Sequence, residues 1–198
     1  MAVIKGRETL KTELPEIERE KIIRAQKGDM NAFCALVDAY KERTVRIAFS
    51  LTGNLADAQD IAQEAFVRVF GKIKNFKFNS KFSTWLYRVT VNVSRDFLRN
   101  RKRSRLVFGS QETHAYSVRA EGPDPAKRLM DKELGHKIDN AVLALPEKQQ
   151  VAFILKYKQD MAVGEIAQIL DVSVATVKVH LFRAIHALQK KLQLEQVL

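Results

Sequence analysis

Residues 163–192, VGEIAQILDVSVATVKVHLFRAIHALQKKL, decide the fold of the C-terminal part of the chain. Within 163–170, apolar residues recur at the spacing of one helical face, which predicts a short helix. The next three residues predict a turn, and residues 174–192 predict a long basic helix that Ser173 can cap. The small residue Ala167 lets the two helices cross closely. This order is typical of a helix-turn-helix, and an ordinary helical hairpin is the alternative.

The second helix of this motif carries residue types that bind DNA. Its predicted exposed face offers groups that can reach a major groove, namely Thr176, Lys178, His180 and Arg183, with Ser173 at the cap. Lysine and arginine bind phosphates or a guanine edge. His180 and His186 stand six residues apart rather than four, so we expect no metal pair on this helix.

A second basic zone lies earlier in the chain. Residues 72–105 contain eleven Lys and Arg but one acid, Asp96. Helical spacing places five side chains of this zone on one face: Trp85, Arg88, Asn92, Arg95 and Arg99. Such a face offers stacking surfaces, an amide for a base edge and phosphate clamps, which single-stranded nucleic acid requires. The loop before it can hold a flipped base and comprises Phe78, Asn79, Ser80, Lys81 and Phe82. The alternative is that these aromatic residues belong to the core, as we expect for Phe76 and Phe82.

Acidic side chains follow one face of the helix predicted over 57–73. Asp57, Asp60 and Glu64 share this face, with Gln63 beside them. Acids near a helix N-terminus complement its dipole, which by itself can explain Asp57. An acidic stripe in a basic protein can instead meet a basic protein partner, and the two interpretations stay open at this point.

Composition narrows the class of protein. The 198 residues carry a net charge of +11 and 46% apolar residues, so a core can form and a polyanionic partner is expected. No apolar run approaches the roughly 20 residues of a membrane-spanning helix, and the N-terminus lacks an apolar signal core. We therefore expect a cytoplasmic protein without membrane insertion. The single cysteine excludes an internal disulfide and a Cys-based zinc site, and we expect no cofactor. Cys34 lies beside an apolar stripe, which predicts a buried thiol, with a redox sensor as the alternative.

Amphipathic helices are predicted over 30–51, 57–73, 84–103, 126–144, 146–157, 163–170 and 174–192. Residues 104–125 are polar, aperiodic and rich in turn formers, which predicts a linker. The expected fold is all-α, with two helical domains joined by a flexible linker. The expected parts are a flexible N-terminus at 1–15, a first domain at 16–103, a linker at 104–127 and a helix-turn-helix domain at 128–195.

These motifs together resemble the extracytoplasmic-function (ECF) class of bacterial RNA polymerase sigma factors, over about residues 17–192. DAQDIAQEAF at 57–66 resembles the polymerase-binding helix of the family. FSTWLYRV at 82–89, followed by Asn92, resembles its segment for melting and reading the −10 element. LPEKQ at 145–149 and the helix-turn-helix resemble its −35-binding domain.

The resemblance implies partners and roles. Core RNA polymerase, through its β and β′ subunits, and promoter DNA, both duplex and melted non-template strand, are the implied partners, together with an anti-sigma factor. It places Asp60, Gln63 and Glu64 on the β′ clamp helices, and residues 79–82 around a flipped base. Lys178 and Arg183 match −35 contacts, with His180 exposed between them. The sequence departs from the family pattern at Asp160 and Ala175, where Gly is common, and at 179–180, where Ser-Arg is common.

Two other classes of protein compete with this interpretation. A LuxR-type transcriptional regulator also carries such a helix-turn-helix, but it needs a receiver or sensor domain, and neither pattern occurs in the first half. A DNA-processing enzyme needs an activated nucleophile or clustered carboxylates that hold a metal. The basic zone has one acid and no such nucleophile, so we expect no catalytic residues.

Overall fold

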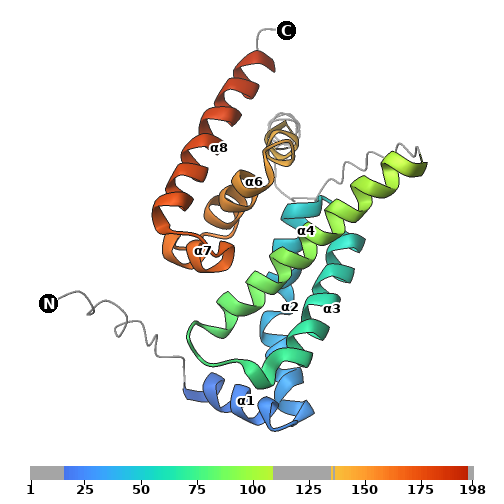
Figure 1. Ribbon diagram of the computed structural model, residues 1–198, viewed down its shortest axis with the longest axis vertical. Helices are drawn as coiled ribbons and strands as arrows, with labels where there is room; N and C mark the ends of the chain where they lie inside the picture. Colours follow the sequence, from blue (N-terminus) through green and yellow to red (C-terminus); the bar gives the residue numbers. More distant parts are fainter. Residues whose placement is uncertain (1–15, 109–134, 136, 196–198) are drawn as a thin grey trace, which may run out of the picture.

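A computed structural model describes residues 16–108, 135 and 137–195, and these residues form helices and turns (Figure 1). The prediction of an all-α fold with two helical units is confirmed. We call residues 16–108 the first unit and the described residues from 135 onward the second unit. The elements are α1 (Glu16–Gln26), α2 (Met30–Thr52), α3 (Leu55–Lys72), η1 (Ile73–Asn75), α4 (Phe82–Phe108), α6 (Glu147–Phe153), η2 (Ile154–Lys158), α7 (Val163–Leu170) and α8 (Val174–Glu195). Residues 137–143 are helical as well.

In the first unit, α2 packs against α1, α3 and α4, and α3 also packs against α4. The side chain of Asp29 caps α2 by accepting a hydrogen bond from Ala32 N at 3.0 Å, and Asn54 caps α3 in the same way. Each cap is worth about 1 kcal/mol. Gly53 ends α2 at φ 70°, a left-handed conformation that glycine adopts without strain. These signals fix a sharp turn between two antiparallel helices.

The core seam of α4 combines apolar side chains with two buried hydroxyl groups. Leu86 and Val93 are buried against the rest of the first unit. Thr90 and Ser94 are fully buried as well, and each donates a hydrogen bond to a carbonyl four residues earlier at 2.9 Å. These bonds satisfy both hydroxyls within the helix. The opposite side of α4 is thereby left for polar contacts.

The second unit contains the predicted helix-turn-helix with the predicted bounds of its first helix. Ser173 caps α8, because its hydroxyl accepts a hydrogen bond from Thr176 N at 3.1 Å. Val177 of α8 is completely buried. Asp171 ends α7 in the left-handed conformation at φ 58°. Asp160, where the family commonly has Gly, is also left-handed at φ 49°, a conformation that Asp tolerates better than most residues.

Several details differ from the sequence-based expectations. The prediction of a buried thiol at Cys34 is wrong, because this cysteine is exposed. Helix α4 continues to Phe108, five residues into the expected linker, and the separate helix α1 was not predicted. The rest of the expected linker, the expected N-terminal tail 1–15 and most of the first half of the helix expected over 126–144 lie outside the described residues. Within the described part of the chain, no helix combines the length and hydropathy needed to cross a membrane.

Candidate nucleic-acid interface

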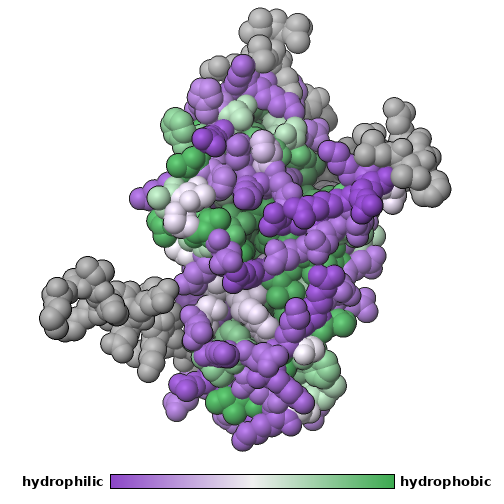
Figure 2. Space-filling view, viewed as in Figure 1, coloured by the Kyte–Doolittle hydropathy of each residue, from purple (hydrophilic) through white to green (hydrophobic). Residues whose placement is uncertain are grey.

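Helix α4 presents the predicted polar face. Asn92 is exposed, and the side chains of Arg88 and Arg99 are 40% and 60% exposed. Arg95 is more enclosed, at 24%, and Trp85 is half-buried. In the space-filling view, hydrophilic side chains gather along the C-terminal half of this helix (Figure 2). The five residues that share this face by spacing therefore include four with accessible polar groups.

Hydrogen bonds from α1 anchor η1 and the start of the loop that leads to α4. Gln26 of α1 donates hydrogen bonds to the carbonyls of Ile73 and Phe76, at 3.0 and 2.8 Å. Phe78 adopts φ 58°, a strained conformation for an aromatic residue. Its ring lies 5.0 Å from the ring of Phe76 and beneath the guanidinium of Arg19. A strained, anchored loop is typical of a functional site.

Within this loop, Asn79 is exposed, and Ser80 and Lys81 are half-buried. Phe82 is different, because its side chain is completely buried. Its ring packs against the rings of Tyr40 and Trp85, at 5.6 and 5.8 Å. Phe82 is therefore a core residue, which was one of the two alternatives. The expectation that it lines an accessible base pocket is wrong for this structure.

Helix α8 presents a second polar face. Ser173, Lys178 and Arg183 are exposed, and Thr176 is half-buried beside the cap. The expectation of an exposed His180 is wrong, since this residue is half-buried at the margin of the core seam. Its Nδ1 is buried and has no hydrogen-bond partner among the described residues. Burial, followed by the positive charges of Lys148 and Arg183, lowers the pKa of His180 and so favours the neutral ring.

Sequence reasoning missed one feature of this helix. The side chain of Phe182 is 72% exposed and stands next to Arg183, and Val179 is exposed on the same side. Gln149, His186 and Ala187 join Phe182 and Arg183 around a shallow hollow. The signal was present in the sequence, because positions 175, 178, 179, 182 and 186 lie opposite the buried seam of α8.

The acidic face of α3 is accessible in part. Asp60, Gln63 and Glu64 are exposed. Asp57 is half-buried and forms an ion pair with Arg101 of α4 at 2.6 Å, and Glu64 pairs with Arg68 of the same helix at 2.7 Å. Val67 and Phe70, which were not predicted, extend the accessible stripe with exposed apolar surface. Acids beside exposed apolar side chains form a surface suited to a protein partner rather than to DNA.

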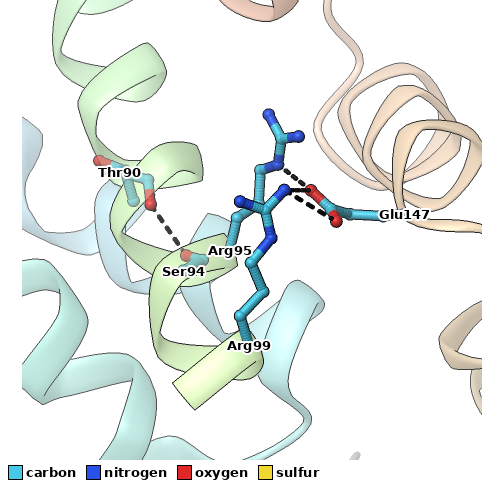
Figure 3. A network of polar contacts seen from close by, with 5 residues as sticks. All are labelled: Thr90, Ser94, Arg95, Arg99 and Glu147. Carbon is cyan, nitrogen blue, oxygen red and sulfur yellow. Dashed lines mark hydrogen bonds and ion pairs between the residues drawn. The ribbon is translucent and has the colours of Figure 1, made fainter. Parts of the chain in front are cut away.

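The second unit covers part of the polar face of α4. Arg95 donates a hydrogen bond to Glu147 at the start of α6, and Arg99 lies 3.4 Å from both oxygens of the same carboxylate (Figure 3). Burial raises the pKa of Glu147, but the hydrogen bonds and charges of Arg95 and Arg99 outweigh it and hold the pKa below its ordinary value. Arg88 pairs with Asp171 at 2.7 Å, and Lys81 pairs with Glu165 at 3.1 Å.

Comparison with known proteins identifies both units. The family model described as Sigma-70 region 2 matches residues 36–104, and that described as Sigma-70, region 4 matches residues 135–188. The chain is 37% identical over 180 residues to the ECF RNA polymerase sigma factor SigW of Bacillus subtilis (strain 168), covering 88% of this chain and 96% of that protein. It is 30% identical over 175 residues to the ECF RNA polymerase sigma-E factor of Escherichia coli (strain K12), covering 86% and 91%.

Solved structures share the fold. A structure of CnrH in complex with the cytosolic domain of CnrY superposes with a TM-score of 0.65 at 24% identity, covering 89% of this chain and 97% of that one. The sigma factor RpoE from Bartonella quintana, in complex with the anti-sigma factor NepR, gives the same TM-score at 20% identity, covering 81% and 96%. Because the Sigma-70 region 2 model matches residues 36–104, the first unit is a sigma region rather than the receiver or sensor of a LuxR-type regulator. With two sigma regions in order and relatives matched along nearly their whole length, the chain belongs to the ECF family of RNA polymerase sigma factors.

Proposed function

We propose that the two units of this sigma factor divide promoter recognition between two forms of DNA. The α4 face and residues 78–81 bind the melted non-template strand of the −10 element, and α8 binds duplex DNA at the −35 element. The observation that carries the proposal is the single α4 face on which Trp85, Asn92 and three arginines follow the anchored loop. The chain has no catalytic role in this scheme and acts in the cytoplasm on core RNA polymerase.

Binding of single strands needs stacking surfaces and cations close together. Trp85 supplies a half-buried ring at one end of the face, and its ring lies 5.0 Å from that of Phe76, which holds it in place. Exposed Asn79 and Asn92 offer amides that can bond to the edge of an unstacked base. The arginines beyond them can follow the phosphates of the strand.

For the −35 element, Lys178 and Arg183 supply cations and Phe182 supplies an apolar group on the same side of α8. An apolar side chain in the major groove discriminates thymine by its methyl group. We propose that Phe182 reads such a methyl group while Lys178 and Arg183 contact phosphates or guanine.

We expect Phe182→Ala to weaken holoenzyme binding to promoters with thymine in the −35 element by about fivefold, since about 1 kcal/mol of apolar contact is lost. Replacing the contacted thymine by uracil should weaken binding of the native protein by the same factor. The same replacement should not weaken binding of the variant any further. Gel-shift titration measures this. Equal loss on thymine and uracil promoters by the variant would contradict the assignment.

The acidic face of α3 is proposed to bind the β′ subunit, and the second unit to lie near β. The acids repel DNA, and the adjacent apolar side chains Val67 and Phe70 give a protein partner surface to bury. We also propose an anti-sigma factor as the controlling partner. Its support is the shared fold with RpoE of Bartonella quintana, which was solved with such a protein.

To test the polymerase site, Asp60→Lys and Glu64→Lys are combined. We expect about a tenfold loss of affinity for core RNA polymerase, because two favourable contacts become repulsive at a basic partner. The matched control combines Asp38→Lys and Glu42→Lys, which reverse two exposed acids with the same spacing on α2. Competition binding to core polymerase measures both. Retained affinity in a folded α3 variant, or equal losses in both variants, would place the polymerase site elsewhere.

A further inference from the structure

Acids of the second unit lie on the bases of the proposed single-strand site. Glu147 at the start of α6 bonds to Arg95 and Arg99, Asp171 at the end of α7 pairs with Arg88, and Glu165 within α7 pairs with Lys81. Three acids from two helices thus meet four bases of one surface. We call these seven residues the acidic clasp.

Hydrogen bonds that involve no acid extend the same interface between the units. Arg43 of α2 donates a hydrogen bond to the carbonyl of Gln159 at 2.9 Å. The side-chain amide of Gln159 in turn donates to the hydroxyl of Ser50 at 3.4 Å. Helix α7 packs along α4, and η2 packs on α2. The second unit is therefore docked on the first rather than merely tethered to it, as the close-up of Glu147 between the two units also illustrates (Figure 3).

The clasp and a DNA strand compete for the same groups. A carboxylate that accepts hydrogen bonds from guanidinium groups resembles a phosphate in charge and geometry. Arg95 is 24% exposed and Glu147 is 39% exposed, so a strand cannot reach Arg95 without displacing this acid. Helix α7 also packs on α4, and the carboxylate of Asp171 pairs with Arg88 at 2.7 Å.

In the docked arrangement, the two units also lie too close together to contact both promoter elements at once. The −10 and −35 elements are centred about 25 base pairs apart, or about 85 Å along duplex DNA. A compact chain of this length has a radius of gyration of about 16 Å. The two units must therefore separate before one molecule can occupy both elements.

From these observations we infer that the acidic clasp holds the free sigma factor in a closed form, in which Glu147, Glu165 and Asp171 occupy the phosphate positions of the −10 strand. The inference rests on the proposed single-strand site on α4 and adds its regulation. The ligand that opens the clasp is the polyanionic strand itself, which competes with these carboxylates for the same bases. Because each ion pair is partly exposed and weak alone, the clasp depends on several pairs acting together.

The test uses the full-length protein without polymerase. In the clasp variant, Glu147→Gln, Glu165→Gln and Asp171→Asn remove the three charges while keeping size. Gln at 165 can still accept the hydrogen bond from Ala162 N that begins α7, and Asn tolerates the left-handed conformation at 171. A control variant removes three exposed acids outside the interface, with Glu20→Gln, Asp38→Asn and Asp139→Asn. Both variants gain the same net charge.

Two measurements are made on each protein: its radius of gyration by small-angle X-ray scattering, and its affinity for a fluorescein-labelled 12-nucleotide single-stranded DNA by anisotropy. We expect the clasp variant to have a larger radius of gyration and to bind the strand at least fivefold tighter than the native protein. The control variant should keep the native radius and bind within twofold of the native affinity.

Equal gains in affinity by both variants would overturn the inference, since net charge alone would then explain them. An unchanged radius with unchanged affinity would overturn it as well. A separate variant tests the single-strand site on which the inference rests.

Asn92→Ala, added to the clasp variant, should lower strand affinity at least threefold. If the clasp variant expands but its strand affinity neither rises nor responds to Asn92→Ala, the single-strand site is not on α4 and the masking role falls with it.

Discussion

The free energy of unfolding is expected to fall by about 3–5 kcal/mol in the Phe82→Ala variant, because a completely buried aromatic side chain leaves a cavity. Phe82 is the first residue of α4. Its ring packs against the rings of Tyr40 in α2, Phe76 in the preceding loop and Trp85 in α4. Chemical unfolding followed by circular dichroism measures the change.

The matched control for this variant is Asn79→Ala in the same loop. Asn79 is exposed, so its replacement should change the free energy of unfolding by less than about 0.5 kcal/mol. A loss below about 1 kcal/mol for Phe82→Ala would mean that the ring is accessible in solution. Phe82 would then be a candidate for the base pocket again.

A second large effect is expected at promoter opening. A holoenzyme with Asn79→Ala and Asn92→Ala should bind its promoter normally but open it at least about 30-fold less, since each lost amide leaves a base edge unpaired at a cost of about 1–3 kcal/mol. Neither residue belongs to the core, as both are exposed. Reactivity of −10 thymines to permanganate measures opening.

The control replaces Asn100, which is also exposed on α4 but lies about a quarter turn from the proposed face. Asn100→Ala should open the promoter as the native protein does. On a template whose −10 region is already unpaired, recovery of the double variant would assign the two amides to melting, and continued failure would assign them to base recognition. Normal opening of the intact duplex by the double variant would place the single-strand site elsewhere.

The elements that the sequence predicted best are those whose signals are local. Helix α7 begins and ends where the apolar spacing placed it, and Ser173 caps α8 as its residue type indicated. The end of α4 was misplaced because residues 104–108, assigned to the linker, include the good helix formers Arg105 and Leu106. Cys34 and His180 were misplaced because both lie at the margin of an apolar stripe, where one residue's rotation decides burial.

Contacts between the units could not be predicted from the sequence. Arg95 and Glu147 are 52 residues apart, and no periodicity links them. The basic zone predicted a polyanionic partner. It did not reveal that acids of the same chain pair with some of its bases. Phe182 was overlooked for a different reason, since an aromatic residue on a helix is normally assigned to the core.

Asp171 meets two demands at once, because it ends α7 in a left-handed conformation and its carboxylate holds Arg88. Glycine or asparagine would suit the turn but bring no charge, and glutamate would bring the charge with a side chain that tolerates the turn less well. Asparagine at 171 would therefore test the ion pair alone, because the turn that ends α7 would be kept while the charge that faces Arg88 is lost.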